Sequence, residues 1–206
     1  MADSRDVVLG RIRKALADRP HPPEVRRDYE RARDVGDVVP LFASRVADYR
    51  AVVHRVRDAV LHVRIEESLR GRQARKMVAP ADVPGWWRVG EVVWSLDGPG
   101  HALSRATLDR SDGVLTGCAV AIAETGTIVL DAGEAQGRRA LTLLPDYHLC
   151  VVRESQIVGT VPEALARLNP SRPLTFISGP SATSDIELDR VEGVHGPRNL
   201  EVLVVG

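Results

Sequence analysis

The sequence predicts an α/β fold, a mixed and mostly parallel sheet flanked by helices, with an N-terminal helical arm. Three observations predict this. From residue 90 onwards, short β-branched runs recur that are apolar throughout, which is typical of strands covered on both faces. Helical signals lie between these runs, and helices that alternate with buried strands indicate an α/β sheet. The first third of the chain keeps helical spacing instead.

The first forty residues are expected to form a helical arm and a proline-rich linker, ahead of an α/β domain over residues 41–206. Apolar residues spaced by one, three and four predict a helix over residues 4–17, with Ser4 as its N-cap. Residues 18–28 contain three prolines and little to bury, so an extended linker is expected there.

Three more helices are predicted before residue 170. Helical spacing of eight apolar residues indicates a long helix around residues 41–58, and charged residues around Leu69 indicate another over 66–76. Thr160 and Glu163 form a capping-box pattern that leads into residues 164–168.

Seven apolar runs are predicted to be strands. Residues 117–131 are expected to form an antiparallel hairpin that turns at Thr125-Gly126, which makes the sheet mixed. The predicted strands are Val92–Leu96, Val114–Thr116, Val120–Ala123, Thr127–Leu130, Leu149–Val152, Leu174–Ile177 and Leu200–Val205.

Composition narrows the class of protein. A chain of 206 residues can bury a core without disulfides or a structural metal. Cys118 and Cys150, each in an apolar segment, are predicted to be buried reduced thiols of a cytoplasmic protein, with one disulfide as the alternative. No C-x-x-C pair occurs, so we expect no cysteine-ligated zinc or iron–sulfur cluster in this chain. No apolar stretch has the length of a membrane helix and no signal-peptide core is visible, so a cytoplasmic location is expected.

Charge is unevenly distributed although the net charge is zero. Residues 1–76 carry a balance of +6 and residues 77–206 a balance of −6. Either these are solvated helix faces, or the basic N-terminal third docks on an acidic partner or on the acidic part of another copy. Basic residues without interleaved aromatics argue against nucleic-acid binding.

The first candidate site is the turn Glu124-Thr125-Gly126-Thr127 between two apolar strands. A carboxylate and two hydroxyls held by a rigid sheet are a common active-site arrangement. The alternative is a plain hairpin turn in which Gly126 supplies a positive φ.

The second candidate site follows the strand that ends at Ile177. Gly179-Pro180 and then small, hydroxylated and acidic residues predict a buried strand, a tight turn and the start of a short helix, whose N–H groups stabilise an anion. The alternative is that Ser184 caps the helix while Asp185 and Glu187 complement its dipole.

The third candidate site is His195, between Gly193 and Gly196 just before the last strand. A histidine there can shuttle a proton, or it can be purely structural. Arg139, next to Arg138, can clamp a carboxylate or phosphate. The chain lacks a P-loop and a G-x-G-x-x-G motif, which excludes P-loop nucleotide hydrolysis. The remaining histidines do not cluster, so no metal site is predicted.

Together these motifs, with Leu143-Leu144-Pro145 and His148, resemble the LutC/YkgG group of the LUD-domain family over about residues 85–206. The resemblance implies a fold similar to the NagB/RpiA/CoA-transferase superfamily and a role in lactate utilisation. LutA-like and LutB-like partners would supply the iron–sulfur clusters for oxidation of L-lactate to pyruvate, and this chain would hold no cofactor.

Three functions compete at this point. In the first, a non-redox subunit of a lactate-oxidising assembly binds a small carboxylate or an anionic cofactor. In the second, an independent enzyme uses Glu124 as nucleophile or base, in a CoA-transferase-like or folate cyclo-ligase-like activity. In the third, a module without catalysis contacts its partner through the basic arm. The predicted catalytic residues are Glu124, Asp185 and His195, and the predicted ligand-binding residues are Thr125, Gly126, Thr127, Arg139, Gly179, Ser181, Thr183, Ser184, Glu187 and Gly196.

Overall fold

The computed structural model describes residues 4–18, 24–180, 182–184, 190–192 and 196–206, with only the backbone described at 182–184 and 190–192. Contacts divide the chain into two compact units, residues 1–30 and residues 31–206. The smaller unit holds helix α1 (Ser4–Ala15), close to the predicted helix over 4–17. The predicted division of the chain at residue 41 stays a prediction.

The larger unit contains a six-stranded sheet of order β1-β12-β7-β4-β2-β3, in which all pairs are parallel. A four-stranded sheet has the order β8-β5-β6-β9 and is mainly antiparallel, and β10 pairs with β11 alone. The strands are β1 (Val52–Val56), β2 (Lys76–Pro80), β3 (Val93–Asp97), β4 (Gly113–Thr116), β5 (Val120–Ile122), β6 (Thr127–Leu130), β7 (Tyr147–Arg153), β8 (Ile157–Val158), β9 (Thr175–Ile177), β10 (Ala182–Ser184), β11 (Arg190–Glu192) and β12 (Asn199–Val205). The helices are α2 (Val38–Asp48), α3 (Leu61–Gly71), α4 (Arg105–Asp109), α5 (Ala140–Leu143) and α6 (Val161–Arg167).

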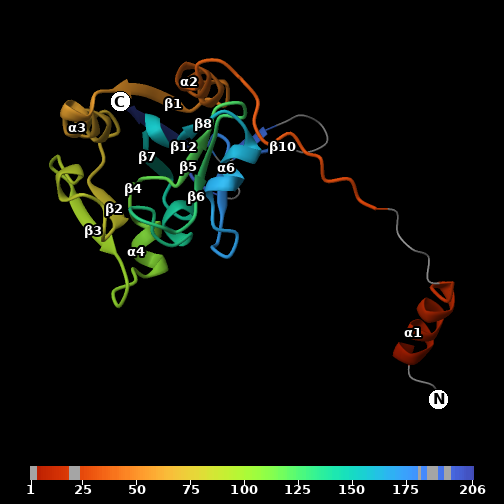
Figure 1. Cartoon of the computed structure of the whole chain (residues 1–206). Coiled ribbons are helices and arrows are strands. Elements are labelled where there is room, and N and C mark those ends of the chain that lie inside the picture. The colour runs from red at the N-terminus through yellow and green to blue at the C-terminus, as the bar shows by residue number, and fades with distance from the viewer. Residues whose placement is uncertain (1–3, 19–23, 181, 185–189, 193–195) are drawn as a thin grey trace. The chain divides into compact units, whose positions relative to one another are not determined.

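The six-stranded sheet is covered on both faces (Figure 1). Along β12, Leu203 packs with α3 residues on one face, whereas Val202 and Val204 pack with α2 and the four-stranded sheet on the other. Neighbouring residues of a strand point to opposite faces, so a strand covered twice must be apolar at every position. The predicted α/β class, with a mostly parallel sheet flanked by helices, is confirmed. The named superfamily fold stays a prediction.

The predicted helix around residues 41–58 is wrong in its second half. Helix α2 ends at Asp48, Arg50 takes a φ of 66°, and Val52–Val56 form β1, which pairs in parallel with β12. Three valines at 52, 53 and 56 satisfy helical spacing, but β-branched residues also fit a strand well. Pairing with the distant β12 decides between the two. The helix predicted over 66–76 is displaced as well, since α3 ends at Gly71 and β2 starts at Lys76.

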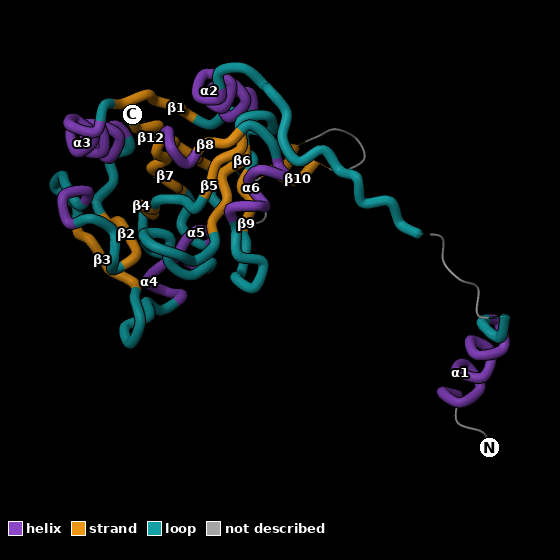
Figure 2. Tube along the Cα trace, in the orientation of Figure 1, coloured by secondary structure: helices purple, strands orange, loops and turns teal. Residues whose placement is uncertain are grey.

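The short helix predicted from Ser184 onwards, with Asp185 and Glu187 in its first turn, lies outside the described residues. Ala182–Ser184 form β10, in which Ser184 pairs with Arg190. The strand before it, β9, is predicted to be buried, but Phe176 is 48% exposed. Figure 2 shows why: β9 is the edge strand of the four-stranded sheet, with only β6 beside it.

A buried carboxylate, Glu201, lies on the face of the six-stranded sheet that α3 covers, and it is 4% exposed. Its Oε2 accepts a hydrogen bond from the Tyr147 hydroxyl at 2.9 Å, and its Oε1 accepts one from Ser68 at 2.5 Å and one from Arg64 at 3.3 Å. Burial and the charge of Arg64 lower the pKa of the nearby His54. The network therefore joins the start of β7, β12 and α3 through one acceptor residue.

Within the part of the chain that the structure describes, none of the helices has the length and apolar character needed to span a membrane.

Candidate functional site

A cavity of about 200 Å³ lies where the first residues of β7 and β12 meet β9 and the turn after it. Gly179 and Pro180 line it from the second predicted turn, and Gly196 lines it from the third. His148 lines it from β7. Two of the three predicted turns thus contribute to one cavity, which lies at the boundary between the two sheets.

The first predicted turn adjoins the second through hydroxyls. Thr125 Oγ1 lies 2.7 Å from Thr127 Oγ1, which lies 2.8 Å from Ser178 Oγ, and Ser178 lines the cavity. Two glycines bring these turns against α2. Gly126 has a φ of 60° and Gly179 a φ of 87°, and a Cβ on either would overlap α2 or Tyr49, the residue after it. The predicted hairpin turn with a positive φ at Gly126 is therefore present.

Glu124 lies outside the residues that line this cavity. Its carboxylate forms an ion pair with Arg33, from the extended segment before α2, and its backbone N–H donates to Gly159 O at 3.0 Å. The Glu124 carboxylate is therefore paired with a residue outside the cavity.

The two neighbouring arginines hold loops in place. The Nε of Arg139 donates to Thr175 Oγ1 at 3.2 Å and its Nη2 donates to Leu174 O at 2.7 Å. Arg138 binds Asp97 with two nitrogens, at 2.9–3.2 Å. Since Thr175 lines the cavity, the positive charge of Arg139 lies one hydrogen bond away from it.

Four predicted site residues, Ser181, Asp185, Glu187 and His195, lie outside the described residues. Thr183 and Ser184 are described only by their backbone in β10. Of the second and third predicted turns, the structure describes Gly179 and Gly196, and both of these residues line the cavity.

His148 is absent from the site predicted from sequence, although it lines the cavity and is 1% exposed. Its Nε2 lies 2.7 Å from Thr116 Oγ1 in the neighbouring strand β4. Two signals in the sequence point to it. His148 belongs to the motifs that carry the family resemblance, and it is a titratable residue inside a largely apolar strand, where a buried polar group needs a partner.

The two cysteines lie beside this histidine in the core. Both are free, buried thiols, as predicted. A hydrogen bond with Cys150 and burial raise the pKa of Cys118, so this thiol stays uncharged at neutral pH. Cys150 also contacts Thr116, whose Oγ1 lies 3.9 Å from its sulfur.

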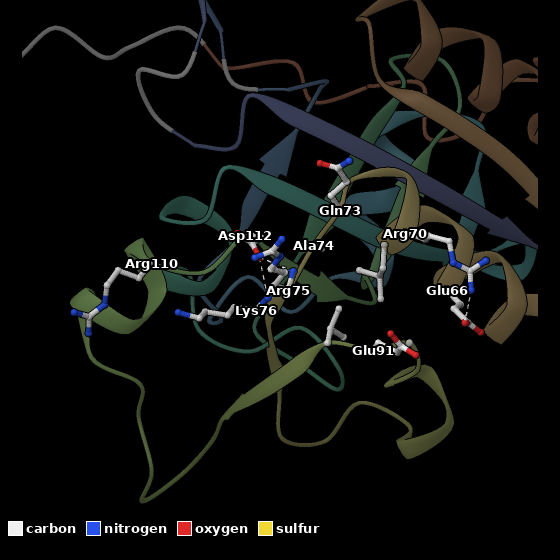
Figure 3. A pocket seen from close by; sticks show the side chains of 12 residues that line it. Glu66, Arg70, Gln73, Ala74, Arg75, Lys76, Glu91, Arg110 and Asp112 are labelled. Carbon is white, nitrogen blue, oxygen red and sulfur yellow. Dashed lines mark hydrogen bonds and ion pairs between the residues drawn. The ribbon is translucent and has the colours of Figure 1, made fainter.

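A second, larger cavity of about 920 Å³ lies at the amino ends of β2 and β3 (Figure 3). Asp112 accepts hydrogen bonds from the backbone N–H groups of Arg75 and Lys76 there, at 2.7 and 2.8 Å, and Arg70 pairs with Glu66. None of the predicted site residues lines this cavity. The smaller cavity is therefore the candidate site.

An ion pair lies next in sequence to a residue of the cavity wall. Arg198 binds Asp146 with two nitrogens, at 2.6 and 2.9 Å, next to Pro197 in the cavity wall. The side-chain hydrogen bond from Arg198 lowers the pKa of Asp146, although burial opposes this. Among the described residues, no group of three or more His, Cys, Asp or Glu side chains is placed to hold a metal ion.

The ion pair between Arg198 and Asp146 should make the free energy of unfolding depend on pH. A carboxyl group with a lowered pKa stabilises the folded state above its ordinary pKa, and this contribution is lost as the pH falls through the folded value. Asp146→Asn should therefore reduce the free energy of unfolding by about 0.2–1 kcal/mol at pH 6, since the pair is partly exposed, and by less at pH 3. Urea unfolding at the two pH values measures this difference. An equal loss at both would contradict the role of the charge.

Comparisons with known proteins identify similar sequences and a family. Residues 41–205 match the family model of the LUD domain. The chain is 49% identical to the Lactate utilization protein C of Deinococcus radiodurans, an alignment that covers 100% of this chain and 97% of the relative. It is 35% identical to the Lactate utilization protein C of Geobacillus kaustophilus over 50% of this chain and 48% of the relative.

A solved structure is also similar. The crystal structure of a DUF162 family protein from Deinococcus radiodurans superposes with a TM-score of 0.67 at 44% identity, and covers 82% of this chain and 96% of that chain. Together with the match to the family model over residues 41–205, these similarities show that the chain belongs to the LUD-domain family.

Proposed function

We propose that this protein is a component of an L-lactate utilisation system and that the cavity beside His148 binds a small carboxylate. The observation that carries the proposal is the full-length similarity to a relative named Lactate utilization protein C. In this system the protein is a non-redox subunit, and LutA-like and LutB-like partners hold the iron–sulfur clusters that oxidise lactate to pyruvate.

The size of the cavity supports a small ligand. Sites for drug-sized molecules enclose about 300–1,000 Å³. A cavity of about 200 Å³ is smaller than this range and suits an organic acid of a few carbon atoms. A nucleotide or coenzyme A would need more room.

The polar groups of the cavity support an anion. Thr175 Oγ1 already accepts a hydrogen bond from Arg139, so its own hydrogen is available to a ligand. Ser178 also lines the cavity, and its hydroxyl lies 2.8 Å from Thr127 Oγ1. The guanidinium of Arg139 behind Thr175 makes the potential there more positive. Hydroxyl donors backed by a cation suit a carboxylate.

The proposed catalytic residues remain Glu124, Asp185 and His195. Gly179 and Gly196, which line the cavity, support this for the two turns that carry Asp185 and His195. Glu124 lies directly before Thr125, the first residue of the Thr125–Thr127–Ser178 hydroxyl chain. The proposed ligand-binding residues are Thr125, Gly126, Thr127, Gly179, Ser181, Thr183, Ser184, Glu187 and Gly196, with Arg139 next to Thr175.

An independent transferase or cyclo-ligase activity is not favoured. It needs the Glu124 carboxylate to reach a bound acyl group or folate, but this carboxylate is paired with Arg33 and lies outside the cavity lining.

Ser178→Ala should weaken the binding of L-lactate about tenfold or more, because a hydrogen bond to a charged group contributes about 1.5–3 kcal/mol. Isothermal titration calorimetry on the full chain measures this. Ser171→Ala, an exposed serine outside the cavity lining, is the matched control and should bind like the wild type. Equal affinities of both variants would remove Ser178 from the site. Absence of lactate and pyruvate binding to the wild type would contradict the proposed function.

Purification of the tagged protein from its own cells tests the partner proposal. Iron–sulfur proteins should co-purify, and the eluate should oxidise L-lactate. An eluate that contains this chain alone would contradict the assignment as a subunit.

A further inference from the structure

We infer that the larger cavity, of about 920 Å³ at the amino ends of β2 and β3, is a docking surface for an extended acidic segment of a partner subunit. The inference rests on the proposed function, in which this protein works together with iron–sulfur partners. It is carried by unpaired cations in the larger cavity and by the position of this cavity beside the candidate site.

Positive charge in the larger cavity is largely unpaired. Three cationic side chains line it without an ion-pair partner among the described residues, namely Arg75, Lys76 and Arg110. All three residues are exposed. The fourth cation, Arg70, is paired with Glu66 at 2.7 Å. Three positive charges are therefore available to bind an anionic partner.

The carboxylates of the larger cavity leave its cationic end free. Asp112 Oδ2 already accepts hydrogen bonds from the backbone N–H groups of Arg75 and Lys76, at 2.7 and 2.8 Å, which also fixes the start of β2. Glu91 is the unpaired carboxylate in the part of the lining that the structure describes. Figure 3 shows Lys76 and Arg110 at one end of the cavity, away from Glu91. This end therefore favours the carboxylates of a partner.

The exposure of these cations favours a protein segment over a small anion. A site for a small molecule buries about 70–90% of its ligand. Here the cations are exposed, and a single exposed ion pair contributes little. An extended acidic segment can place several carboxylates over the cavity at once, and complementary charge also speeds the encounter of two proteins.

The larger cavity lies at the same edge of the six-stranded sheet as the candidate site. The register of the parallel strands aligns Val78 of β2, Val114 of β4 and His148 of β7. His148 lines the candidate site, and Lys76, two residues before Val78, lines the larger cavity. Neighbouring strands are about 4.8 Å apart, so β2 and β7 are separated by about 10 Å at this level. A docked partner would therefore lie beside the bound acid.

Two strand starts connect the cavities. Gly113 directly follows Asp112, which lines the larger cavity. Tyr147 directly precedes His148, which lines the candidate site. A Cβ on Gly113 would lie 2.7 Å from the Tyr147 ring, so the two strand starts are in contact.

The first measurement uses the tagged full-length protein, purified from its own cells. A triple charge reversal, Arg75→Glu with Lys76→Glu and Arg110→Glu, should retain iron–sulfur proteins about tenfold less than the wild type, because like charges repel the acidic segment. Its circular dichroism spectrum and melting temperature should stay close to those of the wild type, since the three side chains are exposed and unpaired.

A matched triple variant is the control. Arg31→Glu with Arg57→Glu and Arg105→Glu changes the net charge equally, at exposed residues that line neither cavity, and should retain the partners like the wild type. Equal retention by all three proteins, or equal loss in both variants, overturns the docking surface alone. If the wild type retains no iron–sulfur protein, the proposed function is contradicted, and the docking surface fails with it.

The second measurement identifies the chemistry of the occupant. In fluorescence anisotropy at low salt, a labelled hexaglutamate peptide should bind the wild type and the control about tenfold or more tighter than the cavity variant. Equimolar pyrophosphate should not displace the peptide. Displacement would indicate a site for a small anion, and a wild-type dimer that the cavity variant cannot form would indicate a second copy as the occupant. Either result overturns the inference.

Discussion

Replacing Glu201 with alanine is expected to lower the free energy of unfolding by about 3 kcal/mol or more. The variant would leave the Tyr147 and Ser68 hydroxyls buried without their acceptor, and it would remove the buried one of the carboxylates that pair with Arg64. The hydrogen bonding of Arg64 is already incomplete, because its Nε is buried with no hydrogen-bond partner among the described residues. Urea unfolding at neutral pH, followed by circular dichroism, measures the loss.

Two further variants separate the carboxylate from its surroundings. Tyr147→Phe removes one hydrogen bond to Glu201 and should cost about 1 kcal/mol. Glu67→Ala removes an exposed partner of the same Arg64 and should cost less than about 1 kcal/mol. If Glu201→Ala cost no more than Glu67→Ala, the buried network would not contribute to stability.

Gly126→Val is expected to cost about 2–5 kcal/mol, the sum of two effects. A β-branched residue at a φ of 60° is strained by about 1–2 kcal/mol. The new Cβ would also lie 2.7–2.8 Å from the backbone of Arg45 and Val46 in α2, so one of the two elements must move. Overpacking of this kind typically costs about 1–3 kcal/mol. Thermal and urea unfolding both report the loss.

Gly100→Val provides the matched control. Gly100 has a φ of 80° but nothing within 4 Å of its would-be Cβ, so it tests the backbone strain without the steric contact. We expect it to cost only the first of the two effects, about 1–2 kcal/mol. Equal losses for the two variants would show that the Gly126 turn does not pack against α2.

Local sequence signals predicted the structure correctly where a segment's neighbours in space were also its neighbours in sequence. The hairpin of β5 and β6 turns at the predicted Thr125-Gly126, and the Thr160 N–H donates to Glu163 Oε2 at 2.8 Å as a capping box requires. The inner strands β7 and β12 were also recognisable, because burial on both faces makes every position of these strands apolar apart from a few paired polar residues.

Local signals failed where a distant partner decided the structure. Val52–Val56 suits a helix or a strand, and the choice depends on β12, about 150 residues later. Likewise, the strand at residues 182–184 was not predicted, because it forms only by pairing with residues 190–192. Periodicity cannot separate such alternatives, because tertiary pairing is stronger than local propensity.

The amino-acid sequence by itself determined the α/β class, the glycine turns and the family, since these depend on local spacing and on motifs in register. Only the tertiary structure decided that Glu124 pairs with Arg33 and that His148 meets Thr116 beside a cavity. Both contacts join segments that are distant along the chain, and their formation depends on the order of strands in the sheets. That order follows from the packing of the whole domain, which no local pattern of residues specifies.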